Sequence, residues 1–268
     1  MLTLLFLGDI VGEPGRSAVI ARLPEWKRDW QLDFVIVNGE NAAAGRGITP
    51  KITIDLLRAG VAVITSGDHI WDRKEIVDFI ATEPRLLRPL NYPAGAPGAG
   101  TVVLETPKGK VGVINVQSRT FMQPILENPF PLLDAAVEEM RKETPVIVVD
   151  IHGETTSEKI AIGRYLDGRV SAVLGTHTHV QTADEQIFEK GTAFICDAGM
   201  CGPIHSILGR TIESVISRFI SNLPAAFPIA LGETRLHGVV VEIDETSGRA
   251  LRIRRIDEPG PADLAPAG

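Results

Sequence analysis

Short apolar runs alternate with longer mixed segments along the first third of the chain. The runs at residues 2–7, 34–37 and 61–65 are mainly aliphatic and lack a helical period, so we interpret them as buried strands. We expect helices between them, over residues 16–30 and 50–59. Strands that alternate with helices are typical of an α/β sheet, whose ligands bind beyond the carboxyl ends of the strands.

Local signals set the expected ends of these two helices. Pro24 indicates a break or restart within the first helix, because an interior proline removes a backbone hydrogen bond. Thr49 is the expected cap of the second helix, with Pro50 at its first position and Gly60 after its last.

The pattern is less regular in the middle of the chain. Residues 85–100, rich in Pro and Gly, predict a loop, and residues 118–131, without a clear period, are interpreted as a lid or an oligomer contact. The remaining predicted strands cover residues 101–104, 111–116, 145–149, 170–174, 192–196, 236–243 and 251–256. The remaining predicted helices cover residues 132–142, 157–166 and 211–222.

The chain shows no internal repeat and no dividing linker. The sequence therefore predicts one domain over residues 1–256. Residues 197–203, which contain two glycines and a proline, are expected to form a loop. Residues 257–268, rich in Pro, Ala and Gly, are predicted to be a disordered tail.

Charge and cysteine content narrow the class of protein. The net charge of -7 argues against a stable nucleic-acid complex, because sequence-independent binding to that backbone depends on Lys and Arg. With Cys196 and Cys201 as its two cysteines, the chain lacks a disulfide framework, which favours a reducing compartment. No apolar run is long enough to span a bilayer. We therefore expect a cytoplasmic protein with no membrane partner.

Polar side chains follow five predicted strands at the point where each strand ends. They are Asp9, Glu40 with Asn41, Asp68 with His69, His152, and His177 with His179. Carboxylates, amide oxygens and imidazoles are the ligands of divalent metals such as manganese, iron and zinc. Each residue alone could be a cap or a packed core residue, but agreement between five strand ends favours a metal site.

The two histidines in Gly175–His179 suggest how many ions bind. Side chains two positions apart on a strand point the same way, with Cα atoms about 6.6 Å apart. His177 and His179 could therefore each hold one of two ions about 3.5–4 Å apart. The alternative is a pair of histidines satisfied at a strand end. If two ions bind, one carboxylate must bridge them, and Glu40 is the natural candidate because Asn41 adds an amide oxygen beside it.

Together these motifs resemble the calcineurin-like metallophosphoesterase superfamily, and in particular its YmdB-type branch, whose members resemble 2′,3′-cyclic-nucleotide 2′-phosphodiesterases. The motifs are Gly8-Asp9-Ile10-Val11-Gly12, Asn38-Gly39-Glu40-Asn41, Gly67-Asp68-His69 with Trp71-Asp72, His152-Gly153-Glu154 and Gly175-Thr176-His177-Thr178-His179. The resemblance extends from Leu4 to about Gly209. It implies an α/β fold, a four-layer α/β/β/α sandwich with a dinuclear metal site.

The resemblance also implies a role for each residue. One ion takes Asp9, Glu40, Asn41 and His179. The other ion takes Glu40, Asp68, His152 and His177. His69 is left as the general acid, and adjacent residues on extended backbone point to opposite sides, so its ring could face the substrate while Asp68 faces the metal. The family usually places Asn where this chain has Asp68, and the extra negative charge is expected to tighten metal binding but weaken attraction of an anion.

The implied reaction is metal-dependent hydrolysis of a phosphodiester, with a 2′,3′-cyclic nucleotide opened to a 3′-phosphate. A hydroxide that bridges the two metals attacks phosphorus and His69 protonates the leaving alkoxide. The alternatives are a phosphomonoesterase or nucleotidase with the same metals, and a nucleotide-sensing regulatory protein with negligible turnover. The presence of a positioned acid weighs against the last.

Three further residues and the assembly state are left open by the sequence. His205, in a Gly-rich loop, either lines the substrate pocket or lies at the surface. Glu154 either orients a ligand histidine or is solvated. Arg46 lies in a loop where it could meet phosphate. The expected partner is a small phosphodiester or nucleotide, and a homo-oligomer is possible.

Overall fold

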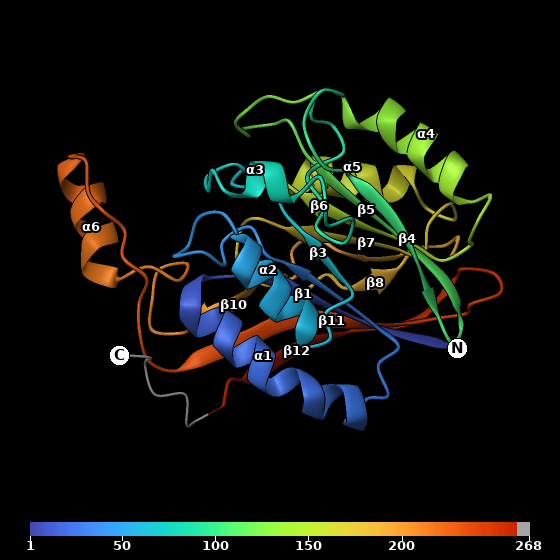
Figure 1. The fold of residues 1–268 in the computed structure, drawn as a ribbon, viewed down its shortest axis with the longest axis horizontal. Helices are drawn as coiled ribbons and strands as arrows, with labels where there is room; N and C mark the ends of the chain where they lie inside the picture. The colour runs from blue at the N-terminus through green and yellow to red at the C-terminus, as the bar shows by residue number, and fades with distance from the viewer. Residues whose placement is uncertain (262–268) are drawn as a thin grey trace.

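A computed structural model describes residues 1–261 and contains two six-stranded sheets packed face to face (Figure 1). The first sheet has the order β12-β11-β10-β1-β2-β3. Its strands are β1 (Leu2–Ile10), β2 (Phe34–Asn38), β3 (Val63–Thr65), β10 (Met200–Pro203), β11 (Thr234–Ile243) and β12 (Ala250–Pro259). Strands β10, β1, β2 and β3 run parallel, so their carboxyl ends lie along one edge.

The second sheet has the order β4-β5-β6-β7-β9-β8. Its strands are β4 (Thr101–Thr106), β5 (Gly109–Gln117), β6 (Ile147–His152), β7 (Ala172–Thr176), β8 (Gln186–Ile187) and β9 (Ala193–Ile195). Strands β5, β6, β7 and β9 are parallel. Each sheet therefore has a parallel centre and at least one antiparallel edge.

Helices lie outside the two sheets, and some of them cover the outer faces. The helices of the described residues are α1 (Gly12–Asp29), α2 (Pro50–Arg58), the short α3 (Ile76–Phe79), α4 (Pro129–Met140), α5 (Thr156–Tyr165) and α6 (Ile212–Ser221). Helices α1 and α2 pack on the first sheet, and α4 and α5 on the second (Figure 1). Between the sheets lies an apolar layer that includes Phe6, Val148 and Leu174. The predicted four-layer α/β/β/α sandwich is confirmed.

Most predicted elements are present, but three local expectations differ. Pro24 lies inside α1 rather than at a break, because Leu23 and Trp26 beside it are buried against the sheet and outweigh a local cost of about 3 kcal/mol. Thr49 caps α2 as predicted, accepting a hydrogen bond from the Ile52 amide at 3.2 Å. The predicted 197–203 loop contains strand β10, which is inserted between β1 and β11.

The C-terminal strand also extends beyond its predicted end. Strand β12 reaches Pro259, which pairs with Arg235 of β11, so residues 257–259 are ordered in a sheet and the prediction of a disordered tail from residue 257 was wrong there. Pairing with β11 along its full length supplies the order that composition did not indicate. Residues 262–268 of that predicted tail lie outside the described residues.

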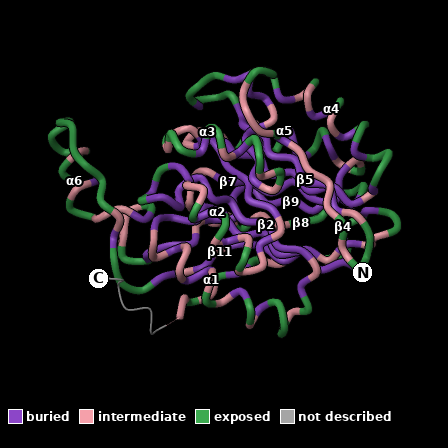
Figure 2. Tube along the Cα trace, in the orientation of Figure 1, coloured by how far each residue is buried: buried purple, intermediate pink, exposed green. Residues whose placement is uncertain are grey.

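Helix α6 projects from the body of the protein (Figure 1), and most of its residues are exposed (Figure 2). Phe219 and Ile220 are 83% and 82% exposed, and Val215 is the buried residue of the helix. Phe121, in the segment predicted to be a lid or contact, is 85% exposed. Self-association stays a prediction. No helix within residues 1–261 is long and apolar enough to cross a membrane.

Candidate metal centre

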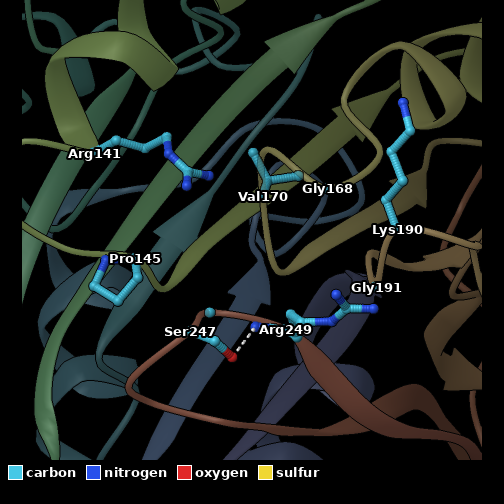
Figure 3. Close-up of a pocket in the computed structure, with 9 residues that line it drawn as sticks. Arg141, Pro145, Gly168, Val170, Lys190, Gly191, Ser247 and Arg249 are labelled. Atoms are coloured by element: carbon cyan, nitrogen blue, oxygen red, sulfur yellow. Dashed lines mark hydrogen bonds between the residues drawn. The ribbon is translucent and has the colours of Figure 1, made fainter.

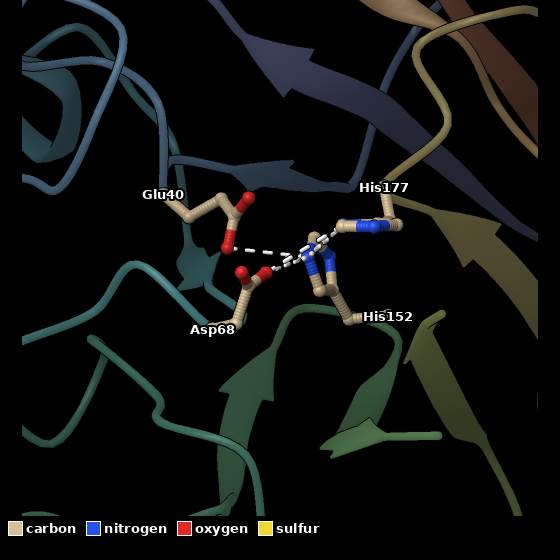
Figure 4. Close-up of side chains that lie close together, drawn as sticks. All are labelled: Glu40, Asp68, His152 and His177. Atoms are coloured by element: carbon tan, nitrogen blue, oxygen red, sulfur yellow. Dashed lines mark hydrogen bonds and ion pairs between the residues drawn. The ribbon is translucent and has the colours of Figure 1, made fainter. Parts of the chain in front are cut away.

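The predicted ligands meet at the carboxyl ends of the parallel strands, where the two sheets adjoin. Glu40 and Asp68 follow β2 and β3 of the first sheet, whereas His152 ends β6 and His177 follows β7 of the second (Figure 4). One ligand atom from each of these four side chains lies within 4.8 Å of the others. The fold thus gathers the second of the two predicted ligand sets into one cluster.

His152 is the centre of this cluster and is fully buried. Its Nε2 lies 3.1 Å from Asp68 Oδ1, 3.2 Å from Glu40 Oε2 and 3.0 Å from His177 Nδ1 (Figure 4). Two carboxylates and two imidazoles converging from different strands are a donor set that suits a divalent transition metal.

The first predicted set lies on the other side of Glu40. His179 Nε2 is 3.2 Å from the Asn41 amide and 3.7 Å from Asp9 Oδ1, and the same amide lies 2.9 Å from Glu40 Oε1. Glu40 therefore directs Oε1 to this set and Oε2 to His152. This is the geometry expected of a carboxylate shared between two positions.

Buried polar groups at this site fit a cation. Asp9 is fully buried, and its Oδ1 has no hydrogen-bond partner, although Oδ2 accepts the His177 amide at 3.0 Å. An unpartnered buried carboxylate oxygen is costly unless an ion or water satisfies it. Gly67 leaves the necessary space, since a Cβ there would collide with Glu40 and His152.

Each of the three predicted ligand histidines also has an acceptor outside the cluster. His152 Nδ1 lies 2.9 Å from Thr176 Oγ1, and His177 Nε2 lies 3.1 Å from Glu154. His179 Nδ1 lies 3.4 Å from the Leu208 carbonyl oxygen. Such outer acceptors fix the tautomer that leaves the inner nitrogen free to bind a metal. Glu154 therefore has the orienting position that the sequence left open.

The backbone at His177 and His179 differs from the sequence prediction. Strand β7 ends at Thr176, so the two histidines do not share a strand face. Their φ angles are 99° and 65°, in the left-handed region that costs a non-glycine residue about 1–3 kcal/mol. The turn sends one imidazole towards His152 and the other towards Asp9, which the two-residue repeat of a strand would not do.

His69 likewise lies in a turn rather than on extended backbone, so the expectation of opposite side-chain directions was based on the wrong local structure. Its amide donates to Glu40 Oε2 at 3.3 Å. Its Nδ1 lies 3.3 Å from Asp72 and 3.5 Å from Asp68, and Arg46 holds Asp72 at 2.7 Å. The ring is therefore beside the cluster, with Asp72 as an outer partner.

Asp150 is a buried residue of the site that sequence reasoning did not assign. Its Oδ1 accepts from the Thr176 hydroxyl at 2.7 Å, and its Oδ2 accepts from Asn38 at 3.0 Å and from Thr65. Because Thr176 gives its proton to Asp150, its oxygen accepts from His152 Nδ1. The signal in the sequence was the i, i+2 spacing of Asp150 and His152 on one strand.

The charges of the cluster shift the pKa values of its members. Burial alone would lower the pKa of His152, but Glu40 and Asp68 raise it well above its usual value. Burial, together with the charge on His152, lowers the pKa of His177 to about 4, and burial lowers the pKa of His179. The two carboxylates thus favour the protonated form of His152 when no metal is bound.

This arrangement predicts a pH dependence of metal binding. A metal must displace a proton on His152, and the raised pKa makes that displacement harder as the pH falls. The apparent affinity should therefore fall by up to about tenfold for each unit that the pH is lowered, for one displaced proton. Manganese titrations between pH 6 and 8 would check this, and an affinity independent of pH would contradict it.

Two other features lie apart from the cluster. His205 is exposed and its ion pair is with Glu233, at 3.8 Å, so its predicted contact with substrate stays a prediction. A small pocket lined by Arg141, Lys190 and Arg249 lies at the amino ends of β6 and β7, opposite the cluster. In Figure 3 these cationic groups point in different directions and do not converge on one point.

A two-sheet sandwich with carboxylates and imidazoles at its strand ends is typical of metal-binding phosphoesterases. Residues 5–256 match the model of the family described as YmdB-like protein, and the chain belongs to this family. It is 50% identical over 255 residues to the 2′,3′-cyclic-nucleotide 2′-phosphodiesterase of Bacillus subtilis, covering 95% of this chain and 96% of that protein.

Solved structures agree with this assignment. A protein of Thermus thermophilus superposes with a TM-score of 0.91 and 40% identity, over 97% of this chain and 100% of that chain. A phosphatase of Mycoplasma pneumoniae gives a TM-score of 0.90 and 34% identity, over 98% and 95% of the two chains. The similarity therefore covers the whole sandwich.

Proposed function

We propose that this chain hydrolyses 2′,3′-cyclic nucleotides to 3′-phosphates at a dinuclear metal site. The observation that carries the proposal is the set of three histidines, each with one nitrogen among buried carboxylates and the other on an outer acceptor. The Bacillus subtilis relative, 50% identical, supports the substrate class.

The residues would divide the work as follows. One ion would be held by Asp9, Asn41 and His179. The other ion would be held by Asp68, His152 and His177, and Glu40 would bind both ions. The metals, when bound, supply an activated water and positive charge to neutralise the phosphate oxygens. His69 would donate a proton to the 2′-oxygen as its bond to phosphorus breaks. Asp72 lies beside His69 Nδ1, at 3.3 Å, which leaves Nε2 as the nitrogen available to the substrate.

A substrate panel with metal analysis tests this function. Protein purified without chelator should hold two ions per chain and open 2′,3′-cyclic nucleotides faster than it hydrolyses mononucleotides. Preference for mononucleotides would instead indicate the phosphomonoesterase alternative. Tight nucleotide binding without turnover in the two-metal form would indicate the regulatory alternative. The choice among iron, manganese and zinc, and a cytoplasmic location, stay predictions from the sequence.

Asp68→Asn tests the departure from the usual family residue. Asp68 lies 3.1 Å from His152 Nε2, so loss of its charge should weaken binding of the ion at that position. With one negative charge fewer beside it, the metal pair becomes more electrophilic. Turnover of the variant at saturating manganese should therefore be equal to or higher than that of the wild type. Titrations of activity with manganese would measure both effects, and an inactive variant at saturating metal would show that the charge is required.

A further inference from the structure

The turn that carries His177 and His179 rests on a buried ion pair with no assigned role. Lys159 of α5 and Asp197, which follows β9, are each 1% exposed, and their charged atoms are 2.9 Å apart. Neither side chain lies among the predicted metal ligands. A buried pair is weak evidence for stability, because desolvation offsets its attraction, so its contacts must indicate its use.

Both members of the pair bind the backbone around His177. The Lys159 ammonium donates to the Thr176 carbonyl at 2.9 Å. Asp197 Oδ2 accepts from the Thr178 amide at 3.0 Å and from the Thr178 hydroxyl at 2.7 Å. Thr176 and Thr178, on either side of His177, are therefore both held by the ion pair.

The same carboxylate also reaches the strand that carries Asp9. Asp197 Oδ1 accepts from the Gly199 amide at 2.8 Å, and the Gly199 carbonyl accepts from the Asp9 amide at 3.0 Å. Asp9 in turn accepts the His177 amide. One buried aspartate thus links the backbone segments that present Asp9, His177 and His179.

We propose that Lys159 and Asp197 are positioning residues that hold the 176–179 turn in its left-handed conformation and so preorganise both metal positions. Neither residue touches metal or substrate in this proposal. It deepens the proposed function and rests on its metal site, but not on the identity of the substrate. Outer partners of metal ligands typically contribute about 10–100-fold to metal affinity.

Metal affinity of the whole protein tests the proposal. Asp197→Asn and Lys159→Met should each raise the manganese dissociation constant, measured calorimetrically, about 10–100-fold, with two ions still bound at saturation. Leu23→Ala is the control, because it creates a cavity under α1 away from the site and should lower thermal stability without changing metal affinity. Wild-type metal affinity in folded Asp197→Asn and Lys159→Met variants would overturn the proposal.

A milder pair of variants covers the case in which a buried charge change prevents folding. Thr178→Val removes one hydrogen bond to Asp197 and leaves the ion pair intact, whereas Thr178→Ser keeps a hydroxyl. Thr178→Val should weaken manganese binding several-fold and Thr178→Ser should restore it; equal affinities would overturn the proposal. If metal binding follows this pattern but cyclic nucleotides are not hydrolysed, the proposed function fails and the positioning role stands.

Discussion

Glu40→Ala is expected to lose both metal ions and to lower hydrolysis of a 2′,3′-cyclic nucleotide by on the order of 10³-fold, because the ions supply several kcal/mol of transition-state stabilisation. Its two carboxylate oxygens face different ligand groups, Oε1 towards Asn41 and Oε2 towards His152. Without Glu40 each ion would keep three protein ligands and lose the shared anion. Metal analysis after gel filtration would measure the loss.

The matched comparison is His179→Ala, because His179 belongs to only one of the two metal positions that Glu40 would share. That variant should reduce occupancy mainly at the position formed with Asp9 and Asn41. Retention of two ions per chain by Glu40→Ala would show that Glu40 does not bridge. Circular dichroism of both variants separates metal loss from unfolding, since Glu40 is 1% exposed and its removal leaves a cavity.

His69→Ala is expected to lower turnover of 2′,3′-cyclic nucleotides by about 10²–10⁴-fold, the usual contribution of a positioned general acid. A ribose alkoxide leaves poorly without a proton, whereas a nitrophenolate leaves readily. Activity on bis-nitrophenyl phosphate should therefore be mostly retained. Comparing the two substrates measures the acid contribution directly.

Metal content is the second readout for His69. Its ring contacts are with Asp68, Asp72 and Arg46, and its backbone amide contacts Glu40. Removal of the ring should leave two ions bound. Equal losses on both substrates together with a fall in metal content would show that His69 supports the cluster rather than the leaving group.

The sequence pattern determined most of the strands and the members of the cluster, whereas the four layers were implied only by the resemblance to the family. Apolar runs such as 34–37 and 145–149 are long enough and β-branched enough to specify buried strands, and parallel strands bring their carboxyl ends to one edge whatever the loops do. Glu40 and Asp68 follow strands of the first sheet, and His152 and His177 end or follow strands of the second. Strand topology therefore brings each pair together, and the packing of the two sheets brings the two pairs into one cluster. Thr49 with Pro50 specified a helix start because capping is a local interaction.

The tertiary structure alone decided the features that depend on partners distant in the sequence. Residues 200–203 form a strand because β1 and β11 flank them, and residues 257–259 are ordered because β11 pairs with them. The turn at His177 has left-handed backbone because Asp197 and Lys159, remote in the chain, bind the residues on either side. Its cost of about 1–3 kcal/mol per residue can be offset only by contacts that form in the folded protein.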